Sequence, residues 1–284
     1  MLTNRVCLVT GASRGVGKGI ALALGASGAT VYVTGRSTRE SDSPFGGTVS
    51  ATADEVTRRG GRGIAIACDH KDDRQVRAVF ERIAREHSRL DILVNNATAI
   101  PDRLTERGPF WDKPLEFADL FEVGARSTYV ATWFAAPMLI REGGVVVNIS
   151  SPGGRCYVHG PAYGGTKAAV DKMAFDMAHD FKPHGVTVVS LWLGLVKTEK
   201  VMSMTAEGAK QYAPFLAFGE SPEYGGRILE ALFADPKRLE QSGKVFFAAE
   251  LAGHYGVKDL NGFEPPSGRG ALGDPPSYSP TVIE

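Results

Sequence analysis

The sequence predicts a single α/β domain, a doubly wound, Rossmann-type sheet of seven parallel strands with helices on both faces. Short apolar runs rich in β-branched residues recur along the 284 residues, and segments with helical periodicity separate them. Strands joined by helical crossovers form a parallel sheet, and because these crossovers are right-handed, helices cover both faces. The length alone would also permit two domains, but the alternation of strands and helices throughout the chain indicates a single domain.

The expected strands take the most apolar runs in chain order. They are Val6–Thr10, Thr30–Thr34, Ile64–Cys68, Ile92–Asn95, Val145–Ile149, Val186–Trp192 and Val245–Ala248. Between the first two strands, Val16, Ile20 and Leu24 form an apolar stripe at helical spacing, and later crossovers repeat this pattern. Each stripe predicts a helix that lies on the sheet.

Two stretches interrupt the alternation. Ser37–Gly47 combines Ser, Asp, Pro and Gly without periodicity directly after the second strand, which indicates an exposed insertion whose role is open. Residues 256–284 hold five prolines among several glycines, a composition that neither continues a helix nor enters a central strand. We expect this tail to be extended or disordered, outside a domain formed by residues 1–255.

Composition excludes several classes of partner. Lys plus Arg equals Asp plus Glu at 32 each, so the chain lacks the positive excess with which proteins bind nucleic acid or an anionic membrane. No apolar run approaches the ~20 residues that cross a bilayer, and the first residues do not resemble a signal peptide. The three cysteines and six histidines show no metal-ligand spacing. These features predict a cytoplasmic protein with a small-molecule ligand and no metal.

A glycine-rich turn follows the first strand. Thr10–Gly17 leads directly into the first helical stripe. Glycine permits a tight turn and lets the backbone approach a pyrophosphate, which N–H groups at the helix N-terminus bind. This setting favours a dinucleotide site over an incidental turn. The expected cofactor contacts here are Gly11, Ser13, Arg14, Gly15, Val16 and Gly17.

The end of the second strand predicts which dinucleotide binds. NAD-binding proteins of this architecture place Asp or Glu there for the ribose 2′-hydroxyl, whereas this chain has Gly35 and then Arg36. A guanidinium pairs with a 2′-phosphate through a forked hydrogen bond, and Arg14 could reach the same phosphate from the turn. NADP(H) is therefore favoured over NAD(H). The alternative is that both arginines are ordinary surface charges.

Tyr163 and Lys167 lie one helical turn apart after the fifth strand. Residues i and i+4 share a helix face, so the phenol and the ammonium can address one site. A free tyrosine ionises near pKa ~10, and a fixed cation nearby lowers that pKa. The spacing alone is a weak signal, since a solvated lysine on an amphipathic helix also fits it. Position strengthens it, because ligands bind at the carboxyl ends of parallel strands, where the glycine turn also lies.

Four motifs, in this order and spacing, resemble the short-chain dehydrogenase/reductase family. They are Thr10–Gly17, Asn95-Asn96-Ala97, Ser150-Ser151 and Tyr163–Lys167. The resemblance covers about residues 5 to 255, and Leu-Trp-Leu-Gly at 191–194 is most similar to one branch of the family. It implies an oxidoreductase that transfers a hydride between a nicotinamide cofactor and a carbonyl or alcohol. It also implies a homodimer or homotetramer.

The resemblance further implies roles at matching positions. Tyr163 would be the general acid or base, Lys167 would bind the nicotinamide ribose and lower the tyrosine pKa, and Ser151 would orient the carbonyl oxygen. Ser150 is the alternative to Ser151, because it lies at the family's usual interval of 13 residues before the tyrosine. The remaining cofactor contacts that the resemblance implies are Asp69 and His70 at the adenine, Asn96 and Ala97 after the fourth strand, and Val196 and Thr198 at the carboxamide.

Some of these residues also have purely structural interpretations. Asn96 would then cap the end of its strand, and Asp69 would cap the helix that begins near Asp72. Thr198–Pro222 occupies the position of the family's substrate lid, and its apolar content suggests an apolar carbonyl compound. Helix packing or a subunit contact explains that content equally well. The apolar lid residues are Met202, Met204, Tyr212, Phe215 and Phe218.

Three positions depart from the family's pattern. Gly124 stands where an asparagine usually supports a proton relay to the lysine, Thr98 replaces a glycine, and Leu193 replaces a proline. Neutral drift in a working enzyme is the favoured interpretation. The alternative is a catalytically weak NADP-sensing binding protein, and an epimerase or dehydratase with the same Tyr-Lys pair fits the glycine spacing less well.

Overall fold

The computed structural model describes residues 1–206 and 213–283, and its centre is a sheet of seven parallel strands. The strand order is β3-β2-β1-β4-β5-β6-β7. The strands are β1 (Val6–Val9), β2 (Thr30–Gly35), β3 (Arg62–Ala67), β4 (Ile92–Asn95), β5 (Val145–Ser150), β6 (Thr187–Trp192) and β7 (Val245–Phe247). All seven expected strands are present, with ends that differ by at most two residues. The predicted fold class is confirmed.

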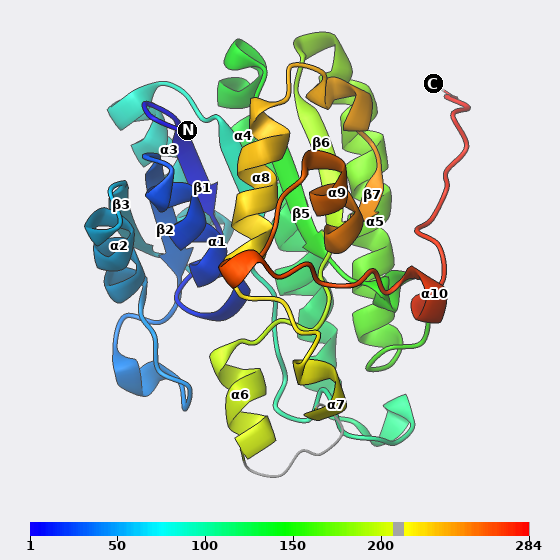
Figure 1. The fold of residues 1–284 in the computed structure, drawn as a ribbon. Helices are drawn as coiled ribbons and strands as arrows, with labels where there is room; N and C mark the ends of the chain where they lie inside the picture. The colour runs from blue at the N-terminus through cyan, green and yellow to red at the C-terminus, as the bar shows by residue number, and fades with distance from the viewer. Residues whose placement is uncertain (207–212, 284) are drawn as a thin grey trace.

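Helices cover both faces of the sheet (Figure 1). One layer contains α1 (Gly15–Ala26), α2 (Val49–Arg58) and α8 (Tyr224–Ala234), and the other contains α3 (Asp73–His87), α4 (Ser127–Glu142) and α5 (Pro161–Phe181). Each layer shares a hydrophobic cluster with the sheet, and the neighbours Leu8 and Val9 of β1 belong to different clusters. Successive strand residues point to opposite faces, so uninterrupted apolar strands supply both cores.

The remaining α-helices in the described part of the chain are α6 (Glu199–Ala206), α7 (Ala213–Leu216), α9 (Ala248–Tyr255) and α10 (Arg269–Leu272). Of these, α9 packs beside α8, and the other three are short helices. Figure 1 shows α6 and α7 together at one end of the molecule, beyond the sheet. A π-helical segment, Phe121–Arg126, precedes α4 and has no counterpart in the sequence-based expectations. Within residues 1–206 and 213–283, no helix is both long and apolar enough to cross a bilayer.

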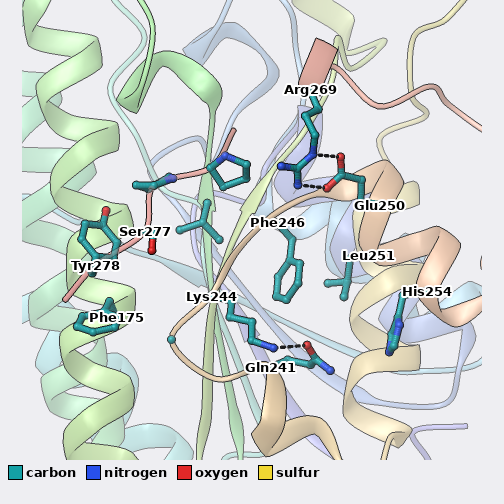
Figure 2. Close-up of a pocket in the computed structure, with 14 residues that line it drawn as sticks. Phe175, Gln241, Lys244, Phe246, Glu250, Leu251, His254, Arg269, Ser277 and Tyr278 are labelled. Atoms are coloured by element: carbon teal, nitrogen blue, oxygen red, sulfur yellow. Dashed lines mark hydrogen bonds and ion pairs between the residues drawn. The ribbon is translucent and has the colours of Figure 1, made fainter. Parts of the chain in front are cut away.

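The proline-rich tail runs along the β7 side of the domain. Arg269 of the tail pairs with Glu250 of α9 at 2.6 Å, and the Tyr278 ring lies 5.2 Å from that of Phe175 on α5. Lys172 places its ammonium 5.5 Å and 5.7 Å from these two ring centroids. Figure 2 shows the Arg269–Glu250 pair and the rings of Tyr278 and Phe175 at the border of a cavity of about 520 Å³ between the tail, β7 and α9. No residue of the glycine turn or of the Tyr163–Lys167 pair lines this cavity.

Candidate active site

The glycine turn is tied to the end of β4. The Thr10 hydroxyl accepts hydrogen bonds from the N–H groups of Asn96 (2.9 Å) and Ala97 (3.0 Å). In return the Asn96 amide donates to the carbonyl oxygens of Thr10 (2.8 Å) and Gly11 (3.0 Å). These hydrogen bonds span 85 to 87 positions of the chain and join the two motifs into one surface. Asn96 acts there as a structural tie, whatever it contributes to a cofactor.

The turn accepts only glycine at its closest approaches. Gly11 and Gly15 have φ angles of 63° and 59°, in the left-handed region that disfavours other residues. A Cβ on Gly17 would lie 2.4 Å from the Asn96 amide nitrogen and 2.5 Å from the Gly11 oxygen. A Cβ on Gly11 would lie 2.8 Å from the Cα of Ala97. The absence of side chains therefore lets the turn, α1 and β4 approach one another.

A carboxylate occupies the N-terminus of α1. The Gly15 N–H donates to Oε2 of Glu199, the first residue of α6, at 2.9 Å. The adjoining Thr198 lies close enough that a Cβ on Gly15 would be 3.5 Å from its methyl group. An anion held by a free helix N–H marks the place where phosphate binds in such turns. The Glu199 carboxylate therefore shows that the N–H of Gly15 is available to an anion.

Arg14 anchors the insertion that follows β2. Its guanidinium donates to the Gly46 oxygen (2.6 Å), the Ser37 hydroxyl (2.7 Å) and the Gly47 oxygen (3.0 Å). Arg36, at the end of β2, is exposed. Burial lowers the pKa of Arg14, and the positive charge of Arg36 acts in the same direction. Arg14 is largely committed to the protein, which leaves Arg36 as the more accessible cation.

His70 presents a polar atom without a partner. The side chain is 5% exposed, its Nε2 lies 2.8 Å from the Thr34 hydroxyl, and its Nδ1 has no hydrogen-bond partner among the described residues. Burial lowers the pKa of His70 to about 4, so the ring is neutral. Neighbouring Asp69 does not cap α3; Asp72 does, by accepting from the Arg74 N–H at 2.9 Å.

The catalytic candidates meet at the end of β5. Ser151 accepts from the Gly153 N–H at 3.0 Å, and its hydroxyl lies beside the Tyr163 ring, close enough to lower the pKa of the phenol. Ser150 is directed elsewhere, since its hydroxyl donates to the backbone oxygen of Lys167 at 3.4 Å. The structure therefore brings Ser151, and not Ser150, to the phenol.

Burial sets the protonation of this pair. Lys167 is 7% exposed, its ammonium donates to the Ile149 oxygen at 3.0 Å, and it lies 5.7 Å from the centroid of the Tyr163 ring. Desolvation lowers the pKa of Lys167 to about 8. Desolvation also raises the pKa of Tyr163, and the Ser151 hydroxyl opposes that rise. The phenol is therefore protonated at neutral pH, in the form that donates a proton.

An apolar wall adjoins the phenol. Tyr163 packs against a small cluster made of Leu104, Phe117 and Leu120 with Ala99 and Ala162. The His159 ring meets the Tyr163 ring edge-on at 5.1 Å, and His159 adopts a φ of 59°, which is unusual for a residue with a side chain. Sequence reasoning did not single out His159. His159 lies just before Pro161, the first residue of α5, and that position gives no distinct sequence signal.

The two ends of the expected lid, near Val196 and Glu220, pair with each other. Val196 forms a parallel bridge with Glu220, and the Gly194 N–H donates to the buried Glu220 carboxyl at 2.9 Å. Phe215 and Phe218 are both 59% exposed. Tyr212 lies outside the described residues.

The departure at position 124 has a steric reason. Gly124 lies in the π-helical segment, and a Cβ there would sit 2.4 Å from the methyl group of Thr166, which is itself buried. Thr166 thus fills the space in which an asparagine side chain would begin. Of the other departures, Leu193 packs against the main hydrophobic cluster, and Thr98 donates to the Ala99 oxygen.

A Rossmann-type sheet whose strand ends unite a phosphate-binding turn with a Ser, Tyr and Lys group defines a nicotinamide-dependent oxidoreductase. A family model described as short chain dehydrogenase matches residues 5–209. The chain belongs to this family, whose members are NAD(P)-dependent enzymes.

Curated relatives narrow the placement. The chain is 41% identical over 273 residues to dehydrogenase/reductase SDR family member 1 of Mus musculus, which covers 92% of this chain and 85% of that protein. It is 39% identical to the Homo sapiens protein of the same name, and that alignment also covers 92% of this chain and 85% of that protein. This supports the branch of the family that the Leu-Trp-Leu-Gly sequence predicts. A 3-oxoacyl-[acyl-carrier-protein] reductase of Synechocystis sp. is 30% identical and covers 86% of this chain and 95% of that protein.

Solved structures agree with this fold. A putative dehydrogenase from Xanthomonas campestris is 26% identical, covers 93% of this chain and 94% of its own, and superimposes with a TM-score of 0.77.

Proposed function

We propose that this protein is an NADP(H)-dependent carbonyl reductase or alcohol dehydrogenase in which Tyr163 is the general acid or base. The supporting observation is that the Ser151 hydroxyl and the buried ammonium of Lys167 both lie beside the Tyr163 ring, the ammonium 5.7 Å from its centroid. A nicotinamide nucleotide bound along the glycine turn supplies or accepts the hydride. The protein supplies orientation and a proton.

The three side chains have different tasks in the proposed reduction. Ser151 donates a hydrogen bond to the carbonyl oxygen of the substrate, and Tyr163 gives its proton to the same oxygen. Burial keeps the phenol protonated before the reaction, and the charge of Lys167 stabilises the phenolate left afterwards. Lys167 also binds the nicotinamide ribose through its ammonium.

The proposed cofactor contacts follow the surface described above. Backbone N–H groups of the turn would bind the pyrophosphate once Glu199 withdraws, and the unpaired Nδ1 of His70 suits the adenine end. The full proposed set is Gly11, Ser13, Arg14, Gly15, Val16, Gly17, Arg36, Asp69, His70, Asn96, Ala97, Tyr163, Lys167, Val196 and Thr198.

The proposed preference for NADP(H) depends on Arg36. It is exposed beside Arg14 at the end of β2, where no carboxylate stands to bind a 2′-hydroxyl. Arg36→Ser should weaken NADPH binding about tenfold and change NADH binding less than twofold, because only NADPH carries the 2′-phosphate. Titration of nicotinamide fluorescence measures both. An equal loss for the two cofactors would contradict the proposed role.

The substrate that fits best is an apolar aldehyde or ketone. The wall beside the phenol consists of Leu104, Phe117 and Leu120, and the lid carries the exposed Phe215 and Phe218. We also propose a homo-oligomer, since α4 presents Tyr129 and Trp133, 55% and 60% exposed, one turn apart on its outer surface. Light scattering would test the oligomeric state.

The enzymatic proposal is tested by NADPH oxidation with a panel of aromatic and aliphatic aldehydes and ketones. The wild-type protein should turn over at least one of them, and Tyr163→Phe should lower kcat about 10³-fold while leaving the Kd for NADPH nearly unchanged. Equal turnover by the variant would contradict the mechanism. Tight NADPH binding without any turnover by the wild type would favour the alternative of an NADP-sensing binding protein.

A further inference from the structure

A carboxylate is buried one helical turn beyond Lys167. Asp171 is 0% exposed and follows Lys167 by four residues on α5, so their side chains lie on one face of the helix. A carboxylate removed from water is destabilising unless the protein hydrogen-bonds or pairs it. The proposed mechanism gives Asp171 no task. The spacing Tyr163, Lys167, Asp171 was the sequence signal that could have revealed it.

Hydrogen-bond donors partly offset the cost of burying a charge at Asp171. The Ser190 hydroxyl and the Trp192 indole N–H, both on β6, donate to its two oxygens at 2.5 Å and 2.9 Å. The Ser150 hydroxyl, at the end of β5, also lowers the pKa of Asp171, and it donates to the Lys167 backbone oxygen of α5 at 3.4 Å. Donors of this kind stabilise an ionised carboxylate. They also tie α5 to the strand end that carries Ser151.

We propose that Asp171 is a positioning residue whose ionised carboxylate is the buried counter-charge that keeps Lys167 protonated. This inference rests on the proposed function, in which the charged Lys167 holds the nicotinamide ribose. The ammonium of Lys167 donates to only one carbonyl, that of Ile149, within the described residues. A neutral oxygen does not offset the cost of burying a full positive charge.

The charges around Asp171 define the pH range of this effect. Burial raises the pKa of Asp171 to about 6, and burial lowers that of Lys167 to about 8 while Asp171 raises it. Both groups are therefore charged between these values. From the tail, Tyr278 also faces Asp171, and its pKa is raised partly by the carboxylate. The groups that face Asp171 from β5 and β6 are the uncharged Ser150, Ser190 and Trp192.

The test is the pH dependence of NADPH binding by the full chain, measured by nicotinamide fluorescence between pH 7 and 10. In the wild type, affinity should fall as Lys167 loses its proton near pH 8. Asp171→Asn preserves shape and removes the charge, so the fall should move to lower pH by on the order of one unit. Ser190→Ala removes one hydrogen bond and keeps the charge, so its fall should stay at the wild-type pH.

The results separate the possible failures. If Asp171→Asn weakens binding by the same factor at every pH, or if Ser190→Ala moves the profile as far as Asp171→Asn does, Asp171 is only structural and the inference is wrong. Wild-type binding without carbonyl turnover would refute the proposed function alone, because the binding profile needs no substrate. Where turnover is present, the alkaline limb of kcat for carbonyl reduction should move with the binding profile.

A measurement on the wild type covers the case in which Asp171→Asn does not fold. The Lys167 side chain, labelled with ¹³C at Cε and assigned with Lys167→Met, should show two inflections in a pH titration. The larger belongs to its own proton, and a smaller one near pH 6 belongs to the coupled carboxylate. A single inflection would contradict the proposal.

Discussion

The two ends of the proposed active site present different chemical groups: backbone at the glycine turn and side chains at the end of β5. At the glycine turn the binding groups belong to the backbone, and side chains are excluded because a Cβ on Gly17 would lie 2.4 Å from the Asn96 amide. At the end of β5 the proposed functional groups are the side chains of Ser151, Tyr163 and Lys167, and burial shifts the pKa values of Tyr163 and Lys167. The first end depends on shape and the second on electrostatics.

Because of this difference, the two ends should tolerate different kinds of substitution. A backbone site is sensitive to one added methyl group and insensitive to pH. A side-chain site is sensitive to one lost charge, and its activity follows the titration of buried groups. Substitutions at the two ends should therefore separate binding from turnover.

The largest effect is expected at Lys167, which serves both ends. Lys167→Met should lower kcat about 10³-fold and weaken NADPH binding about tenfold, because it removes the charge that stabilises the phenolate and the donor to the ribose. Steady-state kinetics and fluorescence titration measure the two losses. If the variant lost turnover but bound NADPH with unchanged affinity, Lys167 would not contact the cofactor.

The next effect distinguishes two adjacent serines. Ser151→Ala should lower kcat about 10²-fold, since its hydroxyl lies at the phenol, whereas Ser150→Ala should lower kcat less than tenfold. The pair is matched in size and chemistry, and circular dichroism shows whether both variants fold. Equal losses, or a larger loss for Ser150→Ala, would mean that the wrong serine is assigned.

A smaller effect is expected at the cofactor end. Gly17→Ala should weaken NADPH binding at least tenfold, because the added carbon forces the turn away from Asn96 and Gly11. Its kcat at saturating NADPH should change less than threefold. Isothermal titration calorimetry gives the affinity, and Gly253→Ala, where no atom lies within 4 Å of the added carbon, is the matched control.

The smallest effect concerns stability. His70 has a folded-state pKa of about 4 against 6.5 when exposed, so the unfolded chain takes up a proton that the folded protein rejects. This part of the stability is complete above pH 6.5 and is lost as the pH falls toward 4, reaching about 2 kcal/mol of destabilisation at pH 5. His70→Gln should lack that loss. Urea unfolding at pH 7.5 and pH 5 measures the change in the free energy of unfolding between the two pH values. An equal change in the wild type and in His70→Gln would contradict this role of His70.

Sequence predicted the fold and most of the proposed site because both follow short-range rules. Strand periodicity located β1 to β7, and the i, i+4 spacing of Tyr163 and Lys167 placed both on one helix face. The choice between Ser150 and Ser151 could not be made by counting, because it depends on how the chain turns after β5. The structure directs the Ser151 hydroxyl to the phenol.

The features that sequence did not reveal are contacts between distant segments. Glu199 reaches the Gly15 N–H across 184 positions of the chain. Thr166 fills the space beside Gly124 from another helix, so the missing asparagine is a consequence of packing. Asp171 gains its hydrogen bonds from β6. None of these follows from local pattern, because each depends on which strand ends meet.

In the proposed reaction a hydride reaches the carbonyl carbon of the substrate while Tyr163 protonates the oxygen. The most direct test incubates the wild-type enzyme with NADPH deuterated at both C4 positions and the best aldehyde or ketone of the panel, followed by mass spectrometry of the alcohol. One deuterium on the carbinol carbon in the wild type, and no labelled alcohol with Tyr163→Phe over the same time, is the predicted result. Alcohol formed without deuterium, or equally by the variant, would contradict it.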